Sequence, residues 1–155
     1  MELHPWSRSI DLIEFLSRIL PLLLVAVGWI IVNHQNNARE ARKEGRAMSD
    51  LAKKQTIEIS EKAMRYLTSS EDGLAHDIKS SLDALEIELD RFPLFSMNSP
   101  LMYQFVRFAD AASGGDFESI ARPIRTRSDK EVLNVLRNRN ALLREIEKQF
   151  KAHYC

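Results

Sequence analysis

An arginine-rich stretch near the C-terminus holds the side chains best suited to contact phosphate. Guanidinium and amide groups there can donate hydrogen bonds to RNA or phosphate oxygens. No aromatic residues alternate with these arginines, as a base-stacking platform would require. The alternative interpretation is a solvated helix face interleaved with acids, which makes nucleic acid an unlikely partner. The candidate contact residues are Arg122, Arg125, Arg127, Arg137, Arg139 and Asn140.

The remaining residue types that could do chemistry are scattered along the chain. Its single cysteine, Cys155, excludes an internal disulfide and a cysteine-based zinc site, and it favours a reducing compartment. None of the four histidines has a partner at metal-ligand spacing on a helix. We therefore predict a protein that is not an enzyme, with no catalytic residue, metal or cofactor. The histidines are His4, His34, His76 and His153.

The uncharged run from Ile19 to Val32 predicts a membrane-spanning helix. On its own this run covers about 21 Å of helix, short of a hydrocarbon core of roughly 30 Å. Including the upstream residues from Ile10 onward extends it to about 35 Å. A cleaved signal peptide and a buried core helix are the alternatives. The charges before the run disfavour a signal peptide, and the lack of a polar face between Leu22 and Ile31 disfavours a core helix.

The upstream extension places three ionisable residues at membrane depth. Asp11, Glu14 and Arg18 share one helix face, and Glu14 can neutralise Arg18 one turn away. Trp6 and Trp29 stand where interfacial aromatic residues are expected. Ionisable groups inside a bilayer are tolerated mainly when they face protein or water. This polar face predicts either contact between copies of the chain or a resting place among the lipid headgroups.

Positive residues indicate the orientation of the span. Arg8 and Arg18 lie before the apolar run, whereas six positive residues follow it closely. We expect a single-pass protein of the inner membrane, with its N-terminus outside and its C-terminal domain in the cytoplasm. The six following residues are Arg39, Arg42, Lys43, Arg46, Lys53 and Lys54.

Beyond the apolar run the sequence predicts only helices. No proline occurs between Pro21 and Pro93, so the anchor should continue as one helix to about Leu67, with Gly45 as its weakest point. A break at 68–73 precedes a second helix, which starts at Leu74 and stops at Pro93. The predicted inward residues of these two helices are Met48, Leu51, Ala52, Ile59, Ala63, Tyr66, Leu67, Leu74, Ile78, Leu82, Leu85, Leu89 and Phe92.

Two more helices complete the predicted domain. Ser99 caps the first, Pro100 occupies its first position, and the sequence SGGD ends it. Ser128 and Glu131 form a capping box that opens the last helix. Their predicted inward residues are Leu101, Phe105, Phe108, Ala112, Val132, Leu136, Leu143, Ile146 and Phe150.

The predicted fold class is all-α, an N-terminal transmembrane helix that continues into a long helix and a cytosolic four-helix bundle. Residues 1–32 form the N-terminal segment and anchor, and 33–155 form the bundle, of which 33–47 is a polar stalk. Lys plus Arg equals Asp plus Glu at 22 each, so no overall charge attracts nucleic acid.

The sequence RNRNALLREIEKQF resembles the active-site segment of HEPN helical bundles, many of which cut RNA. Arg137 with Asn138, or Arg139 with Asn140, matches the arginine and asparagine of that segment, whereas the histidine that follows in the family has no counterpart before His153. The helix order is similar to that of small membrane accessory proteins of type VI CRISPR systems. That resemblance implies a ring of subunits around a membrane pore and a role in phage defence.

Three functional hypotheses follow. The first is a non-enzymatic membrane-anchored scaffold or interaction protein that self-associates, with membrane lipid, other copies of the chain and a cytoplasmic protein as partners. The second is an oligomeric pore or membrane-perturbing effector. The third is a HEPN-like protein that binds or cuts RNA.

Overall fold

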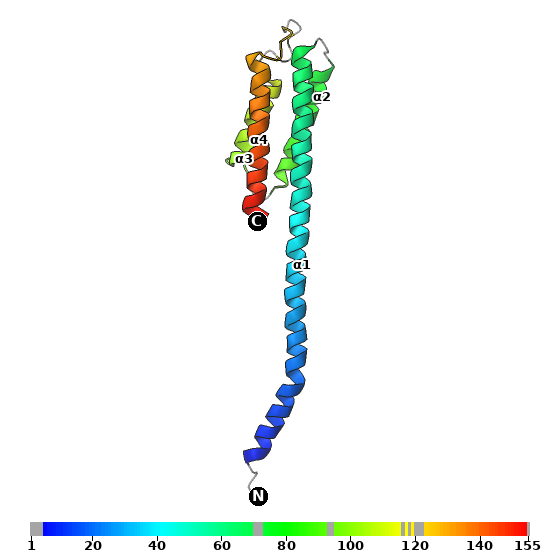
Figure 1. Ribbon diagram of the computed structural model, residues 1–155, viewed down its shortest axis with the longest axis vertical. Helices are drawn as coiled ribbons and strands as arrows, with labels where there is room; N and C mark the ends of the chain where they lie inside the picture. Colours follow the sequence, from blue (N-terminus) through cyan, green and yellow to red (C-terminus); the bar gives the residue numbers. More distant parts are fainter. Residues whose placement is uncertain are drawn as a thin grey trace. The chain divides into compact units, whose positions relative to one another are not determined.

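The computed structural model describes residues 5–69, 73–92, 95–115, 117, 119 and 123–154, with side chains described from Ser17 onward. This part of the chain contains four helices and no strand, as predicted (Figure 1). The helices are α1 (Pro5–Thr68), α2 (Leu74–Asp90), α3 (Pro100–Ser113) and α4 (Lys130–Tyr154).

The chain divides into two compact units, Met1–Arg42 and Lys43–Cys155. The first unit contains the N-terminal part of α1. The second contains the rest of α1 together with α2, α3 and α4, and we call it the bundle. The boundary predicted at 32/33 follows the expected edge of a membrane, and it stays a prediction because compactness does not test it.

Helix α1 ends within one residue of its predicted end at Leu67. Within the bundle its buried face is made largely of small residues at alternating spacings of four and three. This heptad-like spacing keeps them on one side of the helix. Leu51, which we predicted to face inward, is 42% exposed instead, because the buried face runs through Ala52. The buried residues at these spacings are Gly45, Ser49, Ala52, Thr56, Ile59, Ala63 and Tyr66, and Ser60 next to Ile59 is buried as well.

Helices α2 and α3 confirm most of their predicted boundaries and inward stripes. The side chain of Ser99 accepts a hydrogen bond from the backbone N–H of Met102 at 3.1 Å, with Pro100 next to it at the first helical position. Gly73 is the N-cap of α2. The predicted inward residues that are buried are Ile78, Leu82, Leu85, Leu89, Phe92, Leu101, Phe105, Phe108 and Ala112.

The start of α4 differs from the predicted capping box. The helix begins at Lys130, and the carboxylate of Asp129 accepts hydrogen bonds from the backbone N–H and the hydroxyl of Thr126, at 2.8 and 2.7 Å. Glu131 instead pairs with Arg125 at 3.0 Å. Glu131 therefore braces the preceding segment and does not close the helix end.

The buried stripe of α4 is also displaced from the prediction in its middle. Val132, Ile146 and Phe150 are buried as expected, but Leu136 and Leu143 are only half-buried. The fully inward positions between them are Val135, Asn138 and Leu142.

The end of α1 is tied to segments far along the chain. The hydroxyl of Tyr66 donates a hydrogen bond to the backbone carbonyl of Phe117, and the two rings lie with centroids 4.6 Å apart. The backbone N–H of Arg125 donates to the carbonyl of Leu67 at 2.9 Å. The second contact satisfies the carbonyl of Leu67 at the end of α1, where intrahelical partners run out.

Candidate functional site

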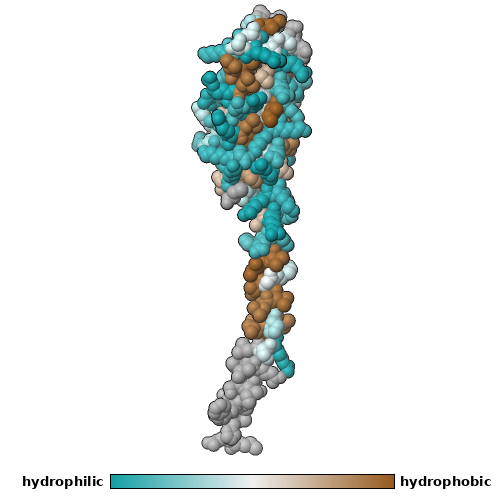
Figure 2. Space-filling model, viewed as in Figure 1, coloured by the Kyte–Doolittle hydropathy of each residue, from teal (hydrophilic) through white to brown (hydrophobic). Residues whose placement is uncertain are grey.

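The N-terminal part of α1 carries an exposed apolar surface between Leu20 and Val32, which we call the apolar segment. Consecutive residues on a helix are about 100° apart, so these side chains surround the helix on every side. Figure 2 shows them as a hydrophobic band followed by a hydrophilic stretch. By length and composition α1 can cross a membrane. The exposed residues, at 51–70% exposure, are Leu20, Leu22, Leu23, Leu24, Val25, Val27, Trp29, Ile30, Ile31 and Val32.

The predicted polar face lies mostly outside the described side chains. Asp11 and Glu14 belong to α1, but their side chains are not among those described, and the same holds for Trp6. Arg18 is exposed, two residues before Leu20. Trp29 is 67% exposed, and its place at the membrane interface stays a prediction. The pairing of Glu14 with Arg18 stays a prediction.

The two described arginines before α4, Arg125 and Arg127, have different surroundings. The guanidinium of Arg125 pairs with Glu131 at 3.0 Å, and its side chain is only 16% exposed. Arg127 is exposed and lines a cavity of about 550 Å³. Arg122 lies outside the described residues. The cavity is otherwise lined by Glu61, Met64, Arg65, Thr68, Val132 and Leu136.

The arginine–asparagine pairs of α4 do not present one polar site. Asn138 is buried and donates to the backbone carbonyl and the side-chain oxygen of Asn134, at 2.9 and 3.0 Å. Arg139 donates from Nε and Nη2 to the side-chain oxygen of Asn140, its neighbour in sequence. Arg137 is exposed one turn earlier. His153 follows Arg139 by about 21 Å of helix, too far for the two side chains to act on one bond.

Metal ligands are not gathered in the described part of the chain. No group of three or more histidine, cysteine or carboxylate side chains there is arranged to hold an ion. The described histidines lie apart, with His34 and His153 both exposed.

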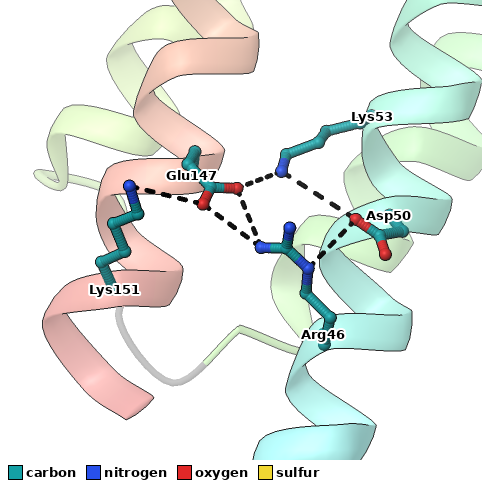
Figure 3. A network of polar contacts seen from close by, with 5 residues as sticks. All are labelled: Arg46, Asp50, Lys53, Glu147 and Lys151. Carbon is teal, nitrogen blue, oxygen red and sulfur yellow. Dashed lines mark hydrogen bonds and ion pairs between the residues drawn. The ribbon is translucent and has the colours of Figure 1, made fainter. Parts of the chain in front are cut away.

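Sequence reasoning missed a network of charges between α1 and α4 (Figure 3). Glu147 of α4 accepts hydrogen bonds from Arg46 and Lys53 of α1, with Arg46 Nη1 3.1 Å from Glu147 Oε2. Asp50 approaches Arg46 at 3.6 Å, and Lys151 approaches Glu147 at 3.7 Å. The hydrogen bond from Lys53 is the main reason that the pKa of Glu147 lies below its ordinary value.

Gly45, predicted as the weak point of α1, has a packing role beside this network. Its backbone is covered by the ring of Tyr154, and a Cβ at this position would overlap that ring. Arg46 meanwhile lies over the ring of Phe150, with its guanidinium carbon 5.0 Å from the ring centroid. The end of α4 is therefore held to the first bundle turns of α1.

No protein-family model, curated protein or solved structure matches this chain.

Proposed function

We propose that this protein is a non-enzymatic, membrane-anchored helical scaffold whose copies associate with one another. The apolar segment of α1 lies across a bilayer of the inner membrane. The bundle lies in the cytoplasm, in agreement with the six positive residues that follow the segment. Membrane lipid, other copies of the chain and a cytoplasmic protein are its partners.

The observation that carries this proposal is the exposure of every large residue in the apolar segment. A core helix of a soluble protein buries such residues, and a surface helix exposes one polar stripe. Here residues such as Val25 and Trp29, at 70% and 67% exposure, lie on a helix with apolar side chains all round. Leaving these side chains in water costs about 25 cal/mol of free energy for each Å² of apolar surface that stays exposed. Contact with the hydrocarbon core of a bilayer removes this cost.

The geometry of α4 supports a role without catalysis. Arg139 is engaged by Asn140, and the buried Asn138 by Asn134, so neither pair offers converging groups to a scissile phosphate. Positioned acid, base and nucleophile groups within hydrogen-bond reach are what such catalysis needs. A scaffold needs only surfaces, and the described side chains supply those.

Self-association is tested with the native cysteine as a single labelling position. The full chain is labelled at Cys155 with donor or acceptor dye and reconstituted into phosphatidylcholine liposomes at decreasing protein-to-lipid ratios. A self-associating chain keeps its energy transfer on roughly 100-fold dilution into excess unlabelled lipid, because a specific complex survives at low surface density. Transfer that falls to the value for randomly distributed monomers would overturn the proposal.

A further inference from the structure

Helix α2 carries an acidic groove on its exposed side. Asp83, Glu86 and Asp90 line it together with the apolar side chains of Ile87 and Phe95, around a volume of about 430 Å³. Ile87 is 63% exposed at its centre. A groove of this kind suits a long cationic side chain, whose aliphatic stem covers the apolar floor while its head meets a carboxylate.

Helix α4 carries a basic stripe on its own exposed side. Arg137, Arg144 and Lys148 follow one another at spacings of seven and four, which keeps them on one face of the helix. All three are exposed. Lys148 approaches Glu145 at 3.8 Å.

The charges of the two surfaces are largely unmatched within one copy. Among the residues that the structure describes, no ion pair involves Asp83, Glu86 or Asp90 of the groove, nor Arg137 or Arg144 of the stripe. The chain as a whole is neutral. An acidic surface and a basic surface on one neutral molecule are complementary to each other in a second copy.

The groove and the stripe lie at the same level of the bundle. Lys62 of α1 contacts Ser81 of α2 at 3.1 Å, two residues before Asp83. Glu61 of α1 lines a cavity with Leu136 of α4, one residue before Arg137. Asp83 and Arg137 are therefore both close to the level of 60–62 in α1.

The match continues two turns further along the helices. Asp90 follows Asp83 by seven residues and Arg144 follows Arg137 by seven, about 10.5 Å of helix in each case. Both helices run antiparallel to the bundle part of α1. The contact of Glu147 with Lys53 fixes α4 at this end, three residues beyond Arg144. Carboxylates and guanidiniums are thus spaced alike and in the same direction.

Helices α2 and α4 each pack against both α1 and α3, so their outward surfaces face different sides of the bundle. When two copies lie side by side with their bundles parallel, the groove of one copy meets the stripe of the next at equal level. This is a head-to-tail interface, in which two different surfaces of the chain meet.

We propose that copies of this chain associate by docking the basic stripe of α4 into the acidic groove of α2 on a neighbouring copy. Arg137 pairs with Asp83, and Arg144 pairs with Asp90, with their stems over Ile87 and Phe95. This proposal rests on the proposed self-association and names its interface. Association through it weakens as salt rises, because exposed ion pairs are screened.

Charge reversal on each surface gives the test. The variant with Asp83→Arg and Asp90→Arg, and the variant with Arg137→Glu and Arg144→Glu, are each reconstituted alone, and transfer between Cys155 dyes is measured. Each alone brings like charges together, so association weakens by about tenfold or more. Mixed one to one, the two variants restore it, because each reversed surface then meets a complementary one. Restored association also shows that both variants are folded.

A control with the same change in charge as the groove variant is Glu44→Arg with Glu58→Arg on α1, outside both surfaces. It associates as the wild-type chain does. A disulfide supplies a direct readout: in chains with Cys155→Ser, copies with Glu86→Cys cross-link to copies with Asn140→Cys, and neither cross-links to itself above background.

Three results separate the two proposals. If the wild-type chain associates and neither reversal weakens it, the interface is wrong and the scaffold stands. If both reversals weaken association and their mixture does not restore it, the pairing is wrong. If the wild-type chain is monomeric in the bilayer, the scaffold itself fails.

Discussion

Arg46 Nη1 of α1 lies 3.1 Å from Glu147 Oε2 of α4, joining residues 101 positions apart in the sequence. Lys53 donates to the same carboxylate. One glutamate thus holds two cations of the neighbouring helix, close to where Tyr154 covers Gly45. These contacts hold this end of α4 against α1.

Replacing Glu147 with glutamine should lower the free energy of unfolding of the bundle by about 1 kcal/mol at neutral pH, as for a partly exposed charge network. The pKa of Glu147 is lowered in the folded chain from its ordinary value of 4.5, mainly by the hydrogen bond from Lys53. Its contribution is therefore full above that ordinary value and is lost as pH falls through the folded value. Urea unfolding in detergent, followed by circular dichroism, should show the variant and the wild type converging in acid.

The control for this prediction is Glu58→Gln, which removes an exposed pair with Lys54 at 3.8 Å. It should change the unfolding free energy by less than about 0.5 kcal/mol. Equal effects of the two substitutions at every pH would contradict the role given to Glu147.

Replacing Ser49 with alanine should stabilise the bundle by about 1 kcal/mol. Ser49 is fully buried, and its hydroxyl has no hydrogen-bond partner among the described residues. A buried polar group without a partner costs roughly 1–3 kcal/mol. The matched control is Thr56→Val, which loses the 2.8 Å hydrogen bond to the carbonyl of Ala52 and should not stabilise. A destabilised Ser49→Ala variant, measured by the same unfolding, would contradict the prediction.

The pore alternative makes its own prediction at the polar face of α1. Glu14→Leu with Arg18→Leu removes two of its ionisable groups, so a pore lined by them should lose its conductance and its oligomer should weaken. Ion leakage from liposomes and cross-linking in membranes measure the two properties. Unchanged association and leakage would mean that these residues are only an interfacial anchor.

The positive residues after the apolar segment predict the topology of the chain in the membrane. A cytoplasmic reporter such as a fluorescent protein fused after Cys155 should be active, and an alkaline phosphatase fused at the same place should be inactive. The reverse pattern would contradict the cytoplasmic placement of the bundle.

The boundaries and stripes that the sequence predicted correctly depend on local signals. Ser99 with Pro100 is a short-range capping pattern, and the apolar stripe of α3 at 101, 105, 108 and 112 is unambiguous. A leucine-rich stretch is compatible with two registers of the buried stripe. In the middle of α4 the stripe that we predicted is therefore displaced, and Leu142 is buried in place of Leu143. Propensity and periodicity do not decide between adjacent leucines.

Burial of small polar residues could not be predicted from the sequence. Gly45, Ser49 and Thr56 look like a solvated face, and only the close approach of the other helices covers them. The network at Glu147 joins positions about 100 residues apart in the sequence, and no local sequence pattern predicts such a pair. The basic residues of the last helix were visible in the sequence, but the acidic groove and its common level with the basic stripe were not, because that level depends on how the helices are paired.

The membrane anchor is the central claim, and extraction of the full chain from membranes with alkaline carbonate tests it most directly. The wild-type chain should stay in the membrane pellet. The variant with Leu23→Asp and Val27→Asp should move to the soluble fraction, because each carboxylate at the bilayer centre costs about 3 kcal/mol. A control with Val106→Asp and Ile124→Asp, both exposed outside the apolar segment, should stay in the pellet. Release of the wild-type chain by carbonate, or retention of the Leu23→Asp, Val27→Asp variant, would contradict the account.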